Sequence, residues 1–280
     1  MDKNRKILIL GGEGFIGRNI ANFLSGHYDC YSVGIEKSKF DGRKDRFIRK
    51  NIYKDRLKNN YAAIIHLIDN PVRGEKFFKE EKKLIKNLEL NENNHLIVFS
   101  SAAVYANPDS DYGKRKLKLE KIYSDYCKNN GIKLTIFRLF NVFGPYQIPN
   151  RQGSLAANTL VNYLNGKTVA INDKKAKRDF IFSPDIGKFI RYVIKNSVTG
   201  KFDLATNEMV TIEALIKKIE TNVIKNKLPL DYKYVKEEIV CPKAKNKLLE
   251  NVKTTSLEDG LKKTFVFYKN NLKTINKLSL

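Results

Sequence analysis

The fold is decided by residues 7–17, which read Ile7-Leu8-Ile9-Leu10-Gly11-Gly12-Glu13-Gly14-Phe15-Ile16-Gly17. An apolar run that stops at a cluster of glycines predicts a buried strand that turns directly into a helix. The glycines would allow a tight turn, close approach of the backbone to a phosphate, and close packing of the helix on its strand. The first N–H groups of such a helix bind a pyrophosphate. We therefore predict a dinucleotide site that includes Gly11, Gly14, Phe15, Ile16 and Gly17, although glycine turns in plain strand-helix units look similar.

The second predicted strand, over 31–35, is followed by Glu36, which lies 19 residues after Gly17. A dinucleotide-binding unit carries near this spacing the carboxylate that binds the adenosine ribose. The alternative is that Glu36 is a solvated residue at a strand end. Arg18, Lys37 and Lys39 could pair with a 2′-phosphate, which Glu36 would repel. We expect NAD as the cofactor, with NADP as the alternative.

The composition is that of a globular protein. With 280 residues, 42% of them hydrophobic, the chain can bury a substantial core. No apolar run approaches a membrane-spanning length, and the first six residues lead straight into a strand rather than into a signal-peptide core, so we expect a cytoplasmic protein. Cys30, Cys127 and Cys241 are widely spaced and form no CxxC motif, so neither a disulfide framework nor a metal site is expected.

The formal net charge of +23 raises the question of a nucleic-acid partner. The lysines are spread along every segment, and no RNA-binding aromatic motif interleaves with them. We therefore expect no nucleic-acid partner and interpret the charge as a lysine-rich composition that solvates most faces. Such a field would still favour encounter with a phosphate-bearing substrate.

Strand-like and helical runs alternate through the first two-thirds of the chain, which predicts a Rossmann-type, doubly wound α/β fold with a parallel sheet covered on both faces. Further strands are predicted at 46–48, 61–68, 95–99 and 134–139, and helices near 75–90 and 112–130.

Beyond Gly144-Pro145 the alternation of strands and helices becomes less regular. Ser183, Thr211 and Ser256 are each predicted to cap the start of a helix. One of these helices is predicted over 211–226. We expect residues 1–145, with 175–205 returning, to form the dinucleotide-binding domain, and residues 146–174 and 206–280 to form a smaller, interleaved substrate-binding lobe.

Tyr112 and Lys116 are four residues apart in a predicted helix, which places a phenol and an ammonium on one face, one turn from each other. A phenol is a poor base at neutral pH because its unperturbed pKa is about 10, and a neighbouring Lys⁺ stabilises the phenolate. Ser101 follows a predicted strand, at the edge where parallel sheets bind their ligands. We predict that these three residues are catalytic, although each alone has a plainer reading as a chance spacing or a helix cap.

Five motifs follow one another in the order of the extended short-chain dehydrogenase/reductase family, at 11–17, 100–105, 112–116, 138–145 and 178–181. The chain resembles the nucleotide-sugar branch of that family, the UDP-glucose 4-epimerase-like epimerases, dehydratases and reductases, clearly over about residues 5–200. Ten residues separate Ser101 from Tyr112, fewer than in most members.

The resemblance implies a role for each residue of the predicted site. Tyr112 would be the acid/base, Lys116 would also hold the nicotinamide ribose, and Ser101 would position the sugar hydroxyl. Asn141 would face the sugar, and Arg178 would face the substrate diphosphate, a bidentate task suited to a guanidinium. The cofactor would also contact Asn51, Ile52 and Leu67.

By the same resemblance, the chain is expected to be an NAD(P)-dependent nucleotide-sugar epimerase that forms a 4-keto intermediate by hydride transfer at sugar C4. A reductase of 4-keto-6-deoxy sugars would run only the second half of this reaction. A 4,6-dehydratase is disfavoured because that subgroup carries Asp-Glu where this chain has Ala102-Ala103. A non-catalytic dinucleotide-binding sensor or RNA-binding protein is the alternative from another class. Family members commonly pair through helices that correspond to residues 75–90 and 112–130, so we expect a homodimer.

Overall fold

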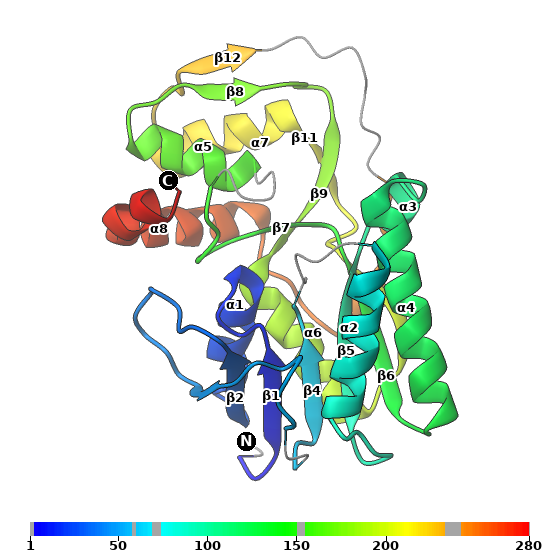
Figure 1. The fold of residues 1–280 in the computed structure, drawn as a ribbon. Coiled ribbons are helices and arrows are strands. Elements are labelled where there is room, and N and C mark those ends of the chain that lie inside the picture. The colour runs from blue at the N-terminus through cyan, green and yellow to red at the C-terminus, as the bar shows by residue number, and fades with distance from the viewer. Residues whose placement is uncertain (1–2, 58–59, 69–73, 150–154, 233–241, 280) are drawn as a thin grey trace. The chain divides into compact units, whose positions relative to one another are not determined.

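The computed structural model describes residues 3–57, 60–68, 74–149, 155–232 and 242–279. The chain divides into two compact units (Figure 1). Unit 1 comprises Met1–Arg138 and Ile186–Phe202, and unit 2 comprises Leu139–Asp185 and Asp203–Leu280. Each unit is therefore built from two separate stretches of the chain, and each is described by itself below.

Unit 1 is built on a seven-stranded sheet with the order β10-β6-β5-β4-β1-β2-β3. Figure 1 labels five of these strands, β6, β5, β4, β1 and β2. β1 pairs in parallel with both β2 and β4, β2 pairs in parallel with β3, and β4 with β5. The strand order reverses between β1 and β4, which confirms the predicted doubly wound sheet. The strands are β1 (Lys6–Leu10), β2 (Asp29–Gly34), β3 (Arg46–Arg49), β4 (Ala63–His66), β5 (His95–Ser101), β6 (Lys133–Leu139) and β10 (Gly200–Leu204), the last two reaching the boundary with unit 2.

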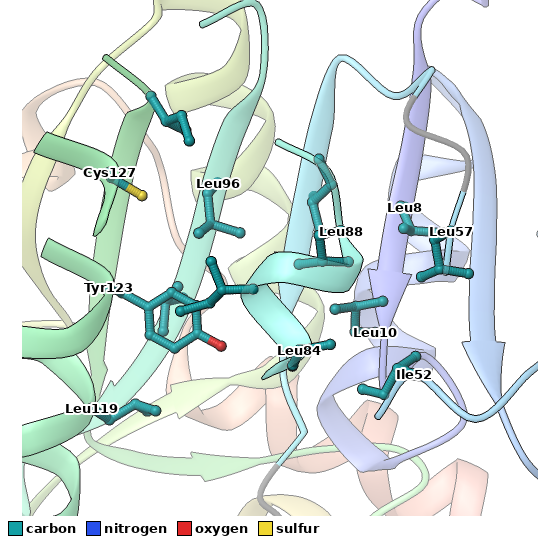
Figure 2. Close-up of a cluster of buried hydrophobic side chains, with 14 of the residues drawn as sticks. Leu8, Leu10, Ile52, Leu57, Leu84, Leu88, Leu96, Leu119, Tyr123 and Cys127 are labelled. Carbon is teal, nitrogen blue, oxygen red and sulfur yellow. The ribbon is translucent and has the colours of Figure 1, made fainter. Parts of the chain in front are cut away.

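Helices cover both faces of this sheet. The helices are α1 (Phe15–Leu24), α2 (Gly74–Asn87), α3 (Ala103–Ala106), α4 (Asp111–Asn129) and α6 (Ser183–Asn196), of which α6 belongs to unit 1 from Ile186 on. Successive residues of a strand point to opposite faces. Leu8 and Leu10 of β1 pack in one core with α2 and α4, whereas Ile7 and Ile9 are fully buried on the other face. Figure 2 shows the first core, with Leu84 of α2 near Leu10 of β1, and Tyr123 of α4 near Leu96 of β5.

A buried polar cluster lies beside this core. Glu81 of α2 is fully buried, and its carboxylate accepts hydrogen bonds from the Tyr123 hydroxyl at 2.8 Å and the Tyr53 hydroxyl at 3.2 Å. His66 Nε2, at the end of β4, lies 3.0 Å from the same carboxylate. Burial alone would raise the pKa of Glu81, but His66 and the hydroxyl donors outweigh it and hold this pKa below its usual value. The cluster ties α2, α4, β4 and the turn after β3 to one carboxylate.

His95 opens β5 and is buried in its neutral form. Its Nε2 lies 2.8 Å from Thr135 Oγ1, which itself donates to the Val198 carbonyl at 2.7 Å, so the imidazole N–H is the donor. Burial, aided by the charge of Lys133, lowers the pKa of His95 to about 4. His95 is therefore protonated only at a lower pH in the folded protein than in the unfolded chain.

We expect this histidine to make stability fall in mild acid. Because the folded pKa lies below the unfolded value of about 6.5, the contribution of neutral His95 is complete above pH 6.5 and is lost as pH falls toward 4. The loss over this window is about 3 kcal/mol in the free energy of unfolding. Urea denaturation at several pH values would measure it, and a His95→Gln variant should show a shallower dependence. Equal slopes in the two proteins would assign the dependence to other groups.

Unit 2 contains two small sheets and several helices. β7 (Asn141–Phe143), β9 (Lys177–Phe182) and β11 (Met209–Thr211) form a three-stranded sheet, and β8 (Val169–Ile171) pairs with β12 (Leu230–Tyr232). The helices are α5 (Leu155–Leu164), α7 (Ile212–Lys218), a π-helix (Ile219–Ile224), a 3₁₀ turn (Lys247–Glu250) and α8 (Leu257–Ser279).

Two of the predicted helix caps in unit 2 are confirmed. Thr211 Oγ1 accepts from the Ala214 N–H at 3.1 Å, and Ser256 Oγ accepts from the Asp259 N–H at 3.1 Å. The prediction of one regular helix over 211–226 is wrong, because the α-helix ends at Lys218 and continues as a π-helix. Within this stretch the Thr221 hydroxyl donates back to the Lys217 carbonyl, a bond that competes with regular helix geometry.

Within the part of the chain that the structure describes, no helix has both the length and the apolar character needed to cross a membrane. Cys30 and Cys127 are buried free thiols, whereas Cys241 lies outside the described residues.

Candidate active site

The glycine loop connects β1 to α1 and has the geometry that a phosphate site needs. Gly11 has a φ of +85°, which favours glycine. A Cβ on Gly17 would lie 2.1 Å from the Gly11 carbonyl oxygen, so only glycine lets α1 start this close to its strand. Gly14 is the N-cap of α1 and brings no side chain, and the first turn of α1 has no acidic residue. The N–H groups at this helix end can therefore receive an anion, and the loop fits a dinucleotide pyrophosphate.

The other residues predicted to touch a cofactor lie at or beyond the carboxyl ends of neighbouring strands. Phe15 and Ile16 begin α1 and are half-buried. Leu67 follows β4, and its N–H donates to the Leu10 carbonyl at 3.0 Å. Asn51 and Ile52 form the turn after β3, where Asn51 Oδ1 accepts from the Tyr53 N–H and Ile52 is buried. All of these residues belong to the sheet edge at which such folds bind nucleotides.

The predicted strand over 31–35 is one residue too long at its end, because β2 ends at Gly34. Glu36 therefore lies two residues beyond the strand, and its side chain is exposed. Glu13 of the glycine loop contacts this segment: its carboxylate accepts from the Ser38 N–H and pairs with Arg43. The interval between the glycine loop and a carboxylate after the second strand, which points to Glu36, does not indicate Glu13.

Tyr112, Lys116 and Ser101 all lie in unit 1. Tyr112 is in the first turn of α4 and is 41% exposed, whereas Lys116, one turn later, is buried with its Nζ 5.5 Å from the centre of the Tyr112 ring. Ser101 is the last residue of β5, and its Oγ accepts from the Ala103 N–H at 3.2 Å. This contact uses a lone pair, so the hydroxyl proton of Ser101 can still be donated to a ligand.

A second cation lies beside the phenol. The Arg115 guanidinium is 5.3 Å from the centre of the Tyr112 ring and 5.3 Å from that of Phe77 on α2. Arg115 is buried. The sequence did not predict this contact of Arg115, because the YxxxK motif specifies only Tyr112 and Lys116 and basic residues are frequent throughout the chain.

The short connection between Ser101 and Tyr112 consists of α3 and a compact turn before α4. Ser110 caps α4: its Oγ accepts from the Gly113 N–H at 3.0 Å and donates to the Asn107 carbonyl at 2.7 Å. A Cβ on Gly113 would lie 2.1 Å from that same carbonyl oxygen. The connection thus lies directly against the first turn of the helix that carries Tyr112.

An ion-pair cluster holds the same connection from the other end. Glu120 lies one turn beyond Lys116, and its carboxylate is bidentate with Arg138 at 2.9 and 2.7 Å. Arg138 also donates to the Tyr105 hydroxyl and lies over the Tyr105 ring at 4.8 Å. Burial would raise the pKa of Glu120, but the hydrogen bonds and charges of Arg138 and Lys201 lower it below its usual value. Through Arg138, Glu120 therefore links α4 to the connection that follows β5.

The predicted substrate residues Asn141 and Arg178 lie in unit 2. They stand on β7 and β9, which pair in parallel, and Asn141 Nδ2 donates to the Asp179 carbonyl at 3.0 Å. Arg178 Nη1 donates to the Lys177 carbonyl at 2.8 Å. The Asp179 carboxylate is buried, which raises its pKa, although Oδ1 accepts from both the N–H and the hydroxyl of Thr206. The structure thus brings the two substrate candidates together on neighbouring strands.

A doubly wound parallel sheet with a glycine loop after its first strand, and a tyrosine and lysine one turn apart after its fifth, defines a dinucleotide-binding protein of the short-chain dehydrogenase type. The chain belongs to the NAD dependent epimerase/dehydratase family, whose model matches residues 7–205. The resemblance seen in the sequence motifs is thereby confirmed.

Comparison with individual proteins supports the same assignment. The bifunctional polymyxin resistance protein ArnA of Wigglesworthia glossinidia brevipalpis is 28% identical over 239 residues, which cover 69% of this chain and 36% of that protein. A UDP-2-acetamido-2,6-beta-L-arabino-hexul-4-ose reductase of Pseudomonas aeruginosa is 24% identical, over 71% of this chain and 52% of the relative. The chain therefore spans about a third to a half of the length of these curated relatives.

Among solved structures, the UDP-N-acetylglucosamine 4-epimerase of Methanobrevibacter ruminantium M1 is similar, with a TM-score of 0.81 at 21% identity, over 95% of this chain and 99% of that chain. The dTDP-glucose 4,6-dehydratase of Bacillus anthracis has a TM-score of 0.83 at 18% identity, over 98% of this chain and 99% of that chain. At sequence identities of 21% and 18%, this structural similarity shows a shared fold.

Proposed function

We propose that this protein is an NAD-dependent enzyme that epimerises a nucleoside-diphosphate sugar at C4 through a 4-keto intermediate. The observation that carries the proposal is the set formed by Ser101, Tyr112 and Lys116 in the same unit as the glycine loop. Structural neighbours described as UDP-glucose 4-epimerases, from Thermotoga maritima and Bifidobacterium longum, support this substrate class.

The residues of the chain would divide the work as follows. Tyr112 removes the proton of the sugar hydroxyl as a general base and returns it as a general acid. Lys116 stabilises the phenolate and holds the cofactor ribose, and the Ser101 hydroxyl donates to the reacting oxygen. Arg178 would neutralise the diphosphate of the substrate. The glycine loop and Lys116 would hold NAD, which would supply reversible hydride transfer at C4, to either face of the sugar.

A reductase is the second candidate. It would use the same three residues but begin from a 4-keto sugar and consume reduced cofactor. The Pseudomonas aeruginosa relative, described as a reductase of a 4-ulose, favours this reading. A dehydratase is not favoured, because Ala102 and Ala103 supply no carboxylate for elimination.

A panel of nucleotide sugars and their 4-keto derivatives, followed by proton NMR, separates the candidates. An epimerase interconverts two C4 epimers in D₂O without net consumption of cofactor and without deuterium entering C4, because the hydride is retained. A reductase consumes NADH in proportion to product. If the protein binds the cofactor but turns over no sugar of the panel, the proposal of an enzyme gives way to a non-catalytic dinucleotide-binding protein.

We also propose a homodimer formed through α2 and α4. The two helices already pack on each other, since Lys118 Nζ of α4 lies 3.9 Å from the centre of the Phe78 ring and 2.7 Å from a carboxylate oxygen of Glu75 on α2. Light scattering at micromolar concentration should give twice the mass of the chain. A monomeric mass would count against pairing through these lysine-rich helices.

A further inference from the structure

The carboxylate of Glu13 links two segments that are far apart in sequence. Glu13 stands in the glycine loop, between Gly12 and Gly14. Its side chain accepts from the backbone N–H of Ser38 and pairs with the guanidinium of Arg43, both in the segment between β2 and β3. The charge of Glu13 therefore lies where the glycine loop meets the segment that follows β2.

Arg43 is fully engaged at this place. Besides Glu13, its Nη1 lies 3.0 Å from Asp45 Oδ2, and its guanidinium lies 5.1 Å from the centre of the Phe47 ring. Its side chain is only 21% exposed. A guanidinium that already faces two carboxylates has little positive potential left for a third anion.

Arg18 is also engaged, although its position just after the glycine loop made it a candidate for binding a phosphate. Its side chain is fully buried, with Nη2 donating to the Asp41 carbonyl at 3.2 Å and Nη1 lying 3.7 Å from Asp45 Oδ1. It cannot reach a ligand on the surface of the loop without leaving this site. Both arginines of the region thus face inward to carboxylates.

In this class of fold the adenosine ribose is bound between the glycine loop and the end of the second strand. A 2′-hydroxyl needs an acceptor there, and a carboxylate provides one. A 2′-phosphate needs uncompensated cations, and it would meet the carboxylate of Glu13 instead. Two further cations follow β2. Lys37 Nζ lies 5.9 Å from the centre of the Phe47 ring, and Lys39 is exposed.

We propose that Glu13, paired with Arg43, is the residue that selects NAD over NADP in this protein. This inference rests on the proposed function, in that it requires a dinucleotide at the glycine loop. The pairing acts in two ways: it neutralises the guanidinium that could receive a 2′-phosphate, and it places a like charge beside the phosphate. The exposed Glu36, to which the sequence spacing points, is the competing determinant.

The test compares five proteins, the wild type and the variants Glu13→Gln, Arg43→Gln, Glu36→Gln and Glu92→Gln. Each is titrated with NADH and with NADPH while cofactor fluorescence is followed. The wild-type protein should bind NADH at least about tenfold more tightly, since one like charge within a few ångströms has about this effect. Glu13→Gln should lower the ratio of the NADPH to the NADH dissociation constant by about tenfold, mainly because NADPH binds more tightly. Arg43→Gln should preserve or widen the preference for NADH, because it leaves the Glu13 carboxylate unpaired. Glu92→Gln removes a distant exposed carboxylate and should change the ratio by less than about twofold.

Calorimetry with 5′-ADP and 2′,5′-ADP on the wild-type protein repeats the comparison on the adenosine end alone and needs no variant to fold. Equal or tighter binding of 2′,5′-ADP or NADPH would overturn this inference while leaving the dinucleotide site intact. A collapse of the preference in Glu36→Gln but not in Glu13→Gln would also overturn it and make Glu36 the determinant. Binding of neither NADH nor NADPH would overturn the proposed function itself.

Discussion

Replacing Tyr112 by Phe is expected to lower turnover by a factor of about 10² to 10⁴ while leaving cofactor affinity close to that of the wild-type protein. The ring keeps its place against Lys116 and Arg115, because both cations lie over the ring. Only the hydroxyl that would move the proton is lost. Steady-state kinetics on a nucleotide sugar found in the panel, together with cofactor titration, measures both quantities.

Two further variants act as controls for this assignment. Lys116→Met removes a charge next to the phenol and a predicted ribose contact, so both turnover and cofactor affinity should fall. Ser101→Ala should lower turnover with cofactor affinity unchanged, because its hydroxyl faces the substrate in the proposed mechanism. Full turnover by Tyr112→Phe would show that the YxxxK spacing is an accident of a lysine-rich helix.

Replacing Glu81 by Ala is expected to cost about 3–5 kcal/mol in the free energy of unfolding, because it removes one side of a buried charged cluster. The hydroxyls of Tyr53 and Tyr123 and the imidazole of His66 would lose their shared partner inside the fold. Glu80→Ala makes the same change at the preceding position, which is half-buried, and should cost less than about 0.5 kcal/mol. Urea denaturation at pH 7 compares the three proteins.

The difference in the free energy of unfolding between the wild type and Glu81→Ala should depend on pH, and it should be smaller in acid. Because the folded protein holds the pKa of Glu81 below its unfolded value, the stabilisation is complete above about pH 4.5 and is lost as pH falls through the folded value. The gap between wild type and Glu81→Ala should therefore narrow in acid. A loss at pH 7 no larger than that of Glu80→Ala would show that the cluster contributes little.

The sequence predicted the architecture of unit 1 because its signals are local and repeated. Buried strands such as β1 and β5 are continuous apolar runs, and Gly17 marks a position where any side chain would meet the Gly11 carbonyl. The short strands of unit 2 gave weaker signals: β7, β11 and β12 have three residues each, too few for a period to be read. They form because their partners are supplied by distant parts of the chain.

Of the candidate site, the sequence indicated the residues that occupy fixed spacings and missed those that depend on contacts across the fold. Glu13 pairs with Arg43 thirty positions away, and Glu120 pairs with Arg138 eighteen positions away. Such pairs have no periodicity, and in a chain with 53 basic residues no single arginine stands out. The roles of Tyr112 and the residues around it stay predictions until kinetics are measured.

The contact between position 113 and the Asn107 carbonyl has an evolutionary consequence. While the connection between Ser101 and Tyr112 stays at ten residues, any methyl group at position 113 collides with backbone. A lineage that lengthens the connection can move Asn107 away from α4, and selection on glycine at 113 is then relaxed. Loop length and the residue at 113 should therefore covary among close descendants of this sequence, with the insertion preceding the substitution.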